Sequence, residues 1–285
     1  MKKYIKLMRL DKPVGIFLLF WPCAWGLAAA KSEGFVDLLF GKYLLLFLLG
    51  SILMRSAGCV YNDIIDKEID SKVARTTERP IALGTVSTKY AWFLIFFLIL
   101  FSLLILFQFN LRSIIFGLSS VILVASYPFM KRITYWPQLF LGITFNWGVI
   151  LGWLVLQNKF NFAPFVIYFS AIFWTLGYDT IYGMQDIKDD LLIGVKSTSI
   201  KFQKNIKLFL TISYAVSILL LILSLTMLKA SWISYFLVFL SGTLLIFQIY
   251  ALKQKKNINY SKLFALNSYY GLSIFISLLI INTHG

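Results

Sequence analysis

Long apolar runs alternate with short polar connections along the whole chain, and this pattern predicts its elements. The runs span residues 13–30, 39–61, 90–108, 111–128, 138–156, 162–182, 206–227, 231–252 and 263–282. Each is close to the roughly 20 residues that a helix needs to cross the hydrocarbon core of a bilayer. Because the runs are continuously apolar and do not alternate, helices are favoured over a membrane barrel. We therefore expect an all-α polytopic membrane protein with nine transmembrane helices.

The composition excludes a soluble domain with a single membrane anchor. The chain is 59% hydrophobic, with a mean hydropathy of +0.80, whereas soluble domains are roughly 45–50% apolar. Cys23 and Cys59 both lie inside apolar runs, so they form neither a disulfide framework nor a metal-binding spacing. The chemistry is therefore expected in the polar connections.

Basic residues orient the predicted helices. If the N-terminus is cytoplasmic, 22 of the 27 Lys and Arg residues fall on the cytoplasmic side, which is the usual bias of membrane proteins. The net charge of +15 then reflects topology and attraction to anionic lipid, and nucleic acid is not an expected partner. We expect a multi-pass protein of a bacterial-type inner (cytoplasmic) membrane, with its N-terminus and active site on the cytoplasmic side.

Acidic residues are concentrated in two windows, 62–70 and 179–190, which hold eight of the twelve Asp and Glu residues. Both windows fall on the predicted cytoplasmic side, after the second and sixth runs. In the first, Asn62, Asp66 and Asp70 are spaced i, i+4 and i+8, which places them on one face of a helix. Carboxylates are costly near a bilayer, so two such clusters indicate a function.

The second window repeats this spacing with Asp186 and Asp190. The candidate donors are all oxygen atoms, and the one histidine, His284, falls on the predicted outer side. This donor set excludes zinc and favours Mg²⁺ or Mn²⁺. The candidate metal ligands are Asn62, Asp63, Asp66, Asp70, Asp186, Asp189 and Asp190. On the predicted helix Asp63 reaches a metal only from a frayed end, and Glu68 points elsewhere.

Nearby basic residues suggest the chemistry of the site. The candidates for substrate binding are Arg75, Arg79, Lys131, Arg132, Lys188 and Lys196. Lys and Arg bind phosphate oxygens, and Mg²⁺ usually shares its coordination with substrate phosphates. The two windows therefore favour departure of a diphosphate whose charge is neutralised by metal and cations. Two alternatives are solvated loops without a ligand and a transporter with a cation site, although a transporter favours acids near the middle of the membrane.

An ordered set of motifs resembles the UbiA superfamily of intramembrane aromatic prenyltransferases, and within it the branch that acts on 4-hydroxybenzoate. The motifs are the Asn-Asp-x-x-Asp-x-x-x-Asp of 62–70, Asp186-x-x-x-Asp190, and the segments Arg9–Gly15, Trp21–Pro22, Met54–Cys59, Arg75–Pro80, Tyr127–Arg132, Pro137–Gln138, Tyr178–Thr180 and Lys196–Thr198. The resemblance implies one integral-membrane domain over 1–285, with nine helices around a central cavity open laterally to lipid.

The resemblance also implies roles. Asn62, Asp66 and Asp70 would hold one Mg²⁺ and Asp186 and Asp190 a second. The four aspartates of these sets would be catalytic. Supporting positions are Asp63, Asp179 and Asp189, with Asp179 beside the substrate, and Lys131 and Arg132 lie near the diphosphate or the aromatic acid.

The reaction implied is transfer of a polyprenyl group from polyprenyl diphosphate to the carbon ortho to the hydroxyl of 4-hydroxybenzoate, in ubiquinone biosynthesis. Homogentisate, a naphthoate and haem are alternative acceptors. Prenyl chain length and oligomeric state stay open at this point.

Overall fold

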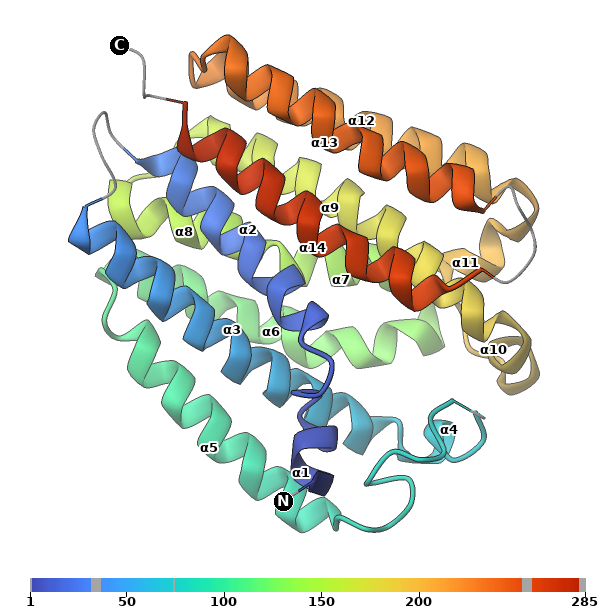
Figure 1. Cartoon of the computed structure of the whole chain (residues 1–285). Coiled ribbons are helices and arrows are strands. Elements are labelled where there is room, and N and C mark those ends of the chain that lie inside the picture. The colour runs from blue at the N-terminus through green and yellow to red at the C-terminus, as the bar shows by residue number, and fades with distance from the viewer. Residues whose placement is uncertain (1, 32–36, 74, 253–257, 282–285) are drawn as a thin grey trace.

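The computed structural model describes residues 2–31, 37–73, 75–252 and 258–281, and in these ranges every regular element is a helix (Figure 1). The long helices are α2 (Val14–Ala30), α3 (Leu38–Ile65), α5 (Thr88–Leu106), α6 (Leu111–Ile133), α9 (Phe162–Gly183), α12 (Ile206–Met227), α13 (Trp232–Ala251) and α14 (Tyr260–Leu279). The shorter segments are α1 (Lys2–Leu7), α4 (Lys67–Asp70), α7 (Pro137–Phe145), α8 (Trp147–Gln157), η1 (Met184–Asp186), α10 (Ile187–Ile193), α11 (Thr198–Lys201) and η2 (Gln203–Asn205). The predicted all-α class is confirmed.

Each predicted apolar run coincides with a long helix or, for 138–156, with the pair α7 and α8. Seven helical segments of the described chain are long and apolar enough to cross a membrane, and α2 is a shorter apolar helix. The remaining run is α9, which is largely buried among the other helices. Nine crossings therefore stays a prediction, although helices occupy all nine positions.

The core lies where α2, α9 and α14 meet. Trp25, Trp174 and Tyr270 are fully buried, and the ring centroid of Trp174 lies 5.1 Å from that of Trp25 and 5.2 Å from that of Tyr270. Helix α2 also packs closely on α8, because a Cβ on Gly26 would clash with the backbone of Val149. Small residues allow such close approach between membrane helices. This half of the bundle is a tightly packed support.

A buried polar network joins α9, α12, α13 and α14. The indole Nε1 of Trp174 donates to Oδ1 of Asn267 at 2.9 Å, and the hydroxyl of Tyr214 donates to Oε1 of Gln248 at 2.9 Å. Nε2 of Gln248 completes the network by donating to Oδ1 of Asn267 at 3.2 Å. Interhelical hydrogen bonds of this kind hold membrane helices together where lipid gives no hydrophobic driving force.

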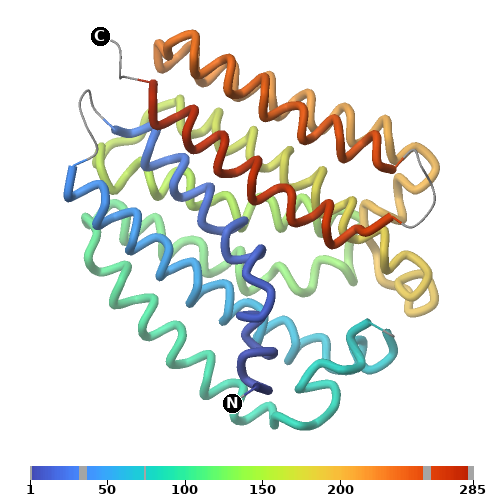
Figure 2. The backbone as a smooth tube through the Cα atoms, in the orientation of Figure 1, coloured from blue at the N-terminus to red at the C-terminus, as the bar shows by residue number. Residues whose placement is uncertain are grey.

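The long helices run side by side, and α1, α4, α10 and α11 gather at one end of the bundle (Figures 1 and 2). We call this end the basic face, because the segments there carry Lys6, Arg9, Arg75, Arg79, Lys131, Arg132 and Lys196. Both acidic windows belong to it. The charge count therefore placed the two windows correctly on one side of the protein.

Candidate active site

A cavity of about 610 Å³ opens between α2, α3, α5, α6, α7, α8 and α9. Its apolar walls include Phe47, Leu103, Leu106, Leu118, Val121 and Trp147. Its polar end is lined by Arg9, Asn62, Asp63, Asp70, Arg75, Arg79, Lys131, Asp179, Asp186, Asp190 and Lys196. The cavity is therefore apolar over most of its walls and charged at the end that lies at the basic face.

The first acidic window is not one continuous helix. Helix α3 ends at Ile65, Asp66 adopts φ −97° and ψ 8°, and the short α4 then runs to Asp70. The backbone N–H of Asp66 still donates to the carbonyl of Asn62 at 2.9 Å, and that of Asp70 to Asp66 at 2.8 Å. The helix therefore breaks at Asp66, although the three residues stay one turn apart as their spacing predicted.

Asp66 is held from α6. Its side chain is fully buried, Lys131 donates to its Oδ2, and Nη2 of Arg132 lies 3.4 Å from its Oδ1. Arg132 also donates to the carbonyl of Ile65 at 2.7 Å. Lys131 lines the cavity, whereas Asp66 does not. These pairs fix the end of α3 against α6.

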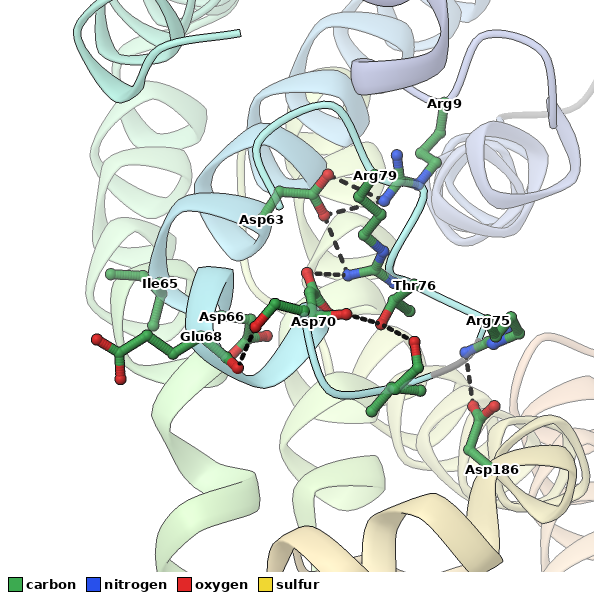
Figure 3. A network of polar contacts seen from close by, with 12 residues as sticks. Arg9, Asp63, Ile65, Asp66, Glu68, Asp70, Arg75, Thr76, Arg79 and Asp186 are labelled. Atoms are coloured by element: carbon green, nitrogen blue, oxygen red, sulfur yellow. Dashed lines mark hydrogen bonds and ion pairs between the residues drawn. The ribbon is translucent and has the colours of Figure 1, made fainter. Parts of the chain in front are cut away.

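Asp63 and Asp70 share the guanidinium of Arg79 (Figure 3). Nη1 of Arg79 donates to Oδ2 of Asp70 at 2.7 Å and to Oδ1 of Asp63 at 3.1 Å. Arg9 reaches Asp63 from the other side. Burial raises the pKa of Asp70 above its usual value, and the charge of Arg79 opposes part of this rise.

In the second window, only Asp186 forms an ion pair within the described ranges. Nη2 of Arg75 donates to its Oδ2 at 2.5 Å, and Nη1 of Arg75 donates to the hydroxyl of Tyr182 at 2.9 Å. Burial and the nearby Asp186 raise the pKa of Asp190 to about 6. In the part of the chain that the structure describes, no hydrogen bond reaches the carboxylates of Asp179, Asp189 or Asp190.

The other candidate residues divide between the cavity and the surface. Lys196 lines the cavity, where its Nζ donates to the carbonyl of Ile133 at 3.1 Å. Lys188 is exposed, and neither it nor Asp189 lines the cavity. Glu68 is exposed, as expected of an acid that points away. His284 lies outside the described residues.

Sequence reasoning missed Arg55 as a site residue. It lies in α3 and lines the cavity, and its Nε is buried without a hydrogen-bond partner. Its guanidinium lies 5.6 Å from the ring centroid of Phe145, and a Cβ on Gly15 would come within 2.6 Å of its Nε. The signal was available, because an arginine inside an apolar run is costly and is usually functional.

The oxygen donors fit a magnesium ion better than a metal enclosed by protein. Among the described residues, no three His, Cys, Asp or Glu side chains gather closely enough to hold a metal ion between them. Asn62, Asp186 and Asp190 instead line the polar end of the cavity with oxygen atoms. Mg²⁺ prefers oxygen, and it commonly takes one or two carboxylates and completes its coordination with water and phosphate.

Comparisons with known proteins identify the family of the chain. Residues 19–278 match the UbiA prenyltransferase family. The chain is 43% identical to a mitochondrial 4-hydroxybenzoate polyprenyltransferase of Drosophila pseudoobscura pseudoobscura, over 98% of this chain and 70% of that protein. It is 42% identical to the protein of the same name from Arabidopsis thaliana, over 95% of this chain and 67% of that protein.

Solved structures share the fold. A UbiA homolog from Aeropyrum pernix K1 superposes with a TM-score of 0.78 at 22% identity, covering 93% of this chain and 97% of that one. A UbiA homolog from Archaeoglobus fulgidus, bound to GPP and Mg²⁺, superposes with a TM-score of 0.66 at 17% identity, covering 97% and 99%. At these identities the likeness establishes the architecture alone.

The predicted membrane was wrong. The relatives are named as mitochondrial enzymes, which points to a mitochondrial membrane and overturns the expectation of a bacterial-type inner membrane with a cytoplasmic active site. The physical reason is that an excess of basic residues orients a chain within a bilayer but does not identify the bilayer.

Proposed function

Because the chain belongs to the UbiA prenyltransferase family, we propose that it transfers a polyprenyl group from polyprenyl diphosphate to 4-hydroxybenzoate, at the ring carbon ortho to the hydroxyl, in ubiquinone biosynthesis. The observation that carries the proposal is the cavity, which joins apolar walls to a polar end with paired carboxylates and cations. A polyprenyl diphosphate has the same division between an oily tail and a charged head. The names of the similar proteins support 4-hydroxybenzoate as the acceptor.

The carboxylates of both windows are proposed to serve magnesium. Asn62, Asp66 and Asp70 would hold one ion and Asp186 and Asp190 a second, with Asp189 as a supporting residue near Asp190. Asn62, Asp70, Asp186 and Asp190 have direct access, because all four line the cavity, whereas Asp66 does not. When bound, Mg²⁺ neutralises negative charge on the diphosphate as it departs.

Basic side chains around the polar end are proposed to bind the diphosphate. Arg75, Arg79, Lys131 and Lys196 all line the cavity, so their cationic groups can meet phosphate oxygens directly. Arg132 is exposed and holds Asp66, so its role is to orient that carboxylate. Lys188 is not proposed to bind the diphosphate, because it is exposed and does not line the cavity.

Arg55 is proposed to bind the carboxylate of the acceptor. Its buried Nε has no hydrogen-bond partner, which leaves a costly unsatisfied donor inside the cavity. A carboxylate satisfies an arginine through charge-assisted hydrogen bonds. Asp179, on α9, lines the same cavity and interacts electrostatically with Arg55.

The reaction then follows from these positions. The C1–O bond of the prenyl diphosphate breaks, and its electron pair leaves with the diphosphate toward Arg75 and Lys131. The ring carbon of the acceptor attacks the allylic cation that remains, and the proton of that carbon then passes to the released diphosphate, the base that the reaction itself supplies. Apolar walls exclude water from the cavity and so protect the cation from hydrolysis.

The test is product formation in membranes that contain the protein. Incubation with 4-hydroxybenzoate and polyprenyl diphosphates of several lengths should give products whose mass equals the acceptor plus the prenyl group. EDTA should stop the reaction and Mg²⁺ should restore it. Product from homogentisate, a naphthoate or haem, with none from 4-hydroxybenzoate, would identify a different acceptor. Ion or solute flux in proteoliposomes that depends on the aspartates, without any prenylated product, would indicate a transporter.

A further inference from the structure

Asp63 has little oxygen left for a metal. Its side chain is 2% exposed, and Nη2 of Arg9 donates to Oδ1 at 2.9 Å and to Oδ2 at 3.0 Å. Nη1 of Arg79 donates to the same Oδ1 at 3.1 Å. Figure 3 shows the carboxylate facing both guanidinium groups. Both oxygens of Asp63 are therefore engaged by arginines.

The contacts continue from Asp63 to the predicted metal ligand Asp70. The Nη1 atom of Arg79 that touches Asp63 also donates to Oδ2 of Asp70 at 2.7 Å. Arg79 lies on the connection between α4 and α5, and Asp63 and Asp70 lie on α3 and α4. A flexible arginine that is held by two carboxylates has lost most of its freedom to reorient. Asp63 thus fixes the direction in which Arg79 presents its remaining N–H groups.

Arg9 brings the N-terminal segment into the same network. Its backbone is in the left-handed region at φ 56°, and its Nη1 donates to the carbonyl of Lys6 at 2.7 Å. A residue other than glycine adopts this conformation only where surrounding contacts hold it. The turn after α1 is therefore built so that Arg9 points at Asp63 (Figure 3).

We propose that Asp63 is a positioning residue and not a metal ligand: it orients Arg79 toward the diphosphate and, through Arg9, fixes the N-terminal segment against the connection between α4 and α5. The part of this role that concerns the diphosphate rests on the proposed function. The part that concerns the two segments rests on the ion pairs alone.

The chain offers a matched control for this network. Lys6 and Glu78 join the same two segments through an ion pair of 3.3 Å, but their side chains are 48% and 79% exposed. Exposed ion pairs contribute little to stability. Lys6→Gln and Glu78→Gln therefore remove a contact between the segments without touching Asp63.

The kinetic experiment compares Asp63→Asn, Arg9→Gln and Arg9→Lys with these two controls. Partners that orient a ligating residue typically contribute roughly 10–100-fold, so Asp63→Asn should raise KM for the polyprenyl diphosphate by about that factor. The Mg²⁺ concentration for half-maximal activity should stay at the wild-type value. Arg9→Lys should recover part of what Arg9→Gln loses, because it keeps a cation beside Asp63. A large rise in the Mg²⁺ requirement of Asp63→Asn, with KM unchanged at saturating Mg²⁺, would identify a metal ligand and overturn the proposal.

A second readout needs no substrate. Hydrogen–deuterium exchange of residues 75–87 should be faster in Arg9→Gln and Asp63→Asn than in Lys6→Gln and Glu78→Gln. Equal exchange in all four variants would overturn the link between the segments. If wild-type protein makes no prenylated product, the proposed function fails, but this measurement still tests the link between the segments. If Asp63→Asn does not fold, the two Arg9 variants still test that link.

Discussion

The two acidic windows differ in how their charges are balanced. In the first, Asp63, Asp66 and Asp70 each form an ion pair with a basic side chain. In the second, Asp186 alone does so among the residues that the structure describes, and its partner Arg75 comes from the connection that follows the first window. One window is therefore electrostatically satisfied by the protein, whereas the other has carboxylates with oxygen atoms available to a ligand.

Because their charges are balanced differently, the two windows should affect the stability of the fold differently. A buried carboxylate with good partners fixes local structure, and removing it leaves its partners uncompensated. A carboxylate whose folded-state pKa is raised, as for Asp190 at about 6, favours folding while it is protonated. That contribution is lost as the pH rises from the unfolded value through 6, so the ionised group disfavours the folded state at neutral pH. Burial raises the pKa of Asp70 in the first window too, so the expected difference in stability rests on the buried ion pairs of the first window.

The largest expected effect comes from removing one carboxylate of either window. Asp66→Ala and Asp186→Ala should each reduce the rate of prenyl transfer by on the order of a thousandfold, because both windows act on one departing diphosphate. The measurement is product mass per unit of inserted protein in detergent-extracted membranes. Glu68→Ala, an exposed acid of the first window, is the control and should retain activity. Activity that survives Asp186→Ala would break the view that the second window binds the diphosphate through metal.

Measurements of stability should distinguish the two windows, whereas the loss of activity should be similar for both. In protein freed of divalent metal with EDTA, Asp66→Asn should lower the free energy of unfolding by about 3 kcal/mol, since Lys131 and Arg132 lose their buried partner. Asp190→Asn should leave the Tm unchanged or raise it, because it removes an ionised group that lacks an ion pair in the described structure. Thermal unfolding of both variants at pH 7 measures the contrast. Equal losses of Tm would show that the two windows are not balanced differently.

Much of this arrangement could be predicted from the sequence because it depends on local pattern. The apolar runs located the helices, and the distribution of Lys and Arg put both windows at one end. The break between α7 and α8 could not be predicted, because Asn146 there is fixed by a contact that is distant in sequence. Its Nδ2 donates to the hydroxyl of Thr175 on α9 at 2.8 Å. Tertiary partners, and not the apolar pattern, decided this detail.

The same limit applies to the site. The spacing of Asn62, Asp66 and Asp70 indicated a shared face, but a helical repeat carries no information about Lys131, which draws Asp66 toward α6. Arg9 and Asp63 are 54 residues apart, so their contact follows only from the way α1 packs on α3. The sequence therefore identified the reactive groups, whereas their division into balanced and available carboxylates required the fold.

Arg75 reaches Asp186 of the second window from the connection that follows the first window. Arg75→Ala should lower kcat/KM for the polyprenyl diphosphate by roughly 10–100-fold, as expected for a partner that orients a ligating group. The loss should appear mainly in KM, because Arg75 lines the cavity and is expected to bind the diphosphate as well as Asp186. Lys72→Ala is a suitable control, since Lys72 is an exposed cation three residues earlier. An equal effect of the two variants would show that Arg75 acts only through its positive charge and not through its contact with Asp186.

The smallest effects should distinguish Lys188, which lies in the second window, from Lys196, which follows it. Lys196 lines the cavity beside the tail of α6, whereas Lys188 is exposed on α10. A hydrogen bond to a charged group is worth about 1.5 kcal/mol or more, so Lys196→Ala should raise KM for the diphosphate roughly tenfold. Lys188→Ala should leave KM at the wild-type value, because a solvated cation outside the cavity is screened by salt. Repeating both measurements at high ionic strength sharpens the test, since any residual effect of Lys188 should then disappear while that of Lys196 persists. If Lys188→Ala proves the more damaging, α10 must turn toward the cavity when substrate binds, and the second window is more mobile than the first.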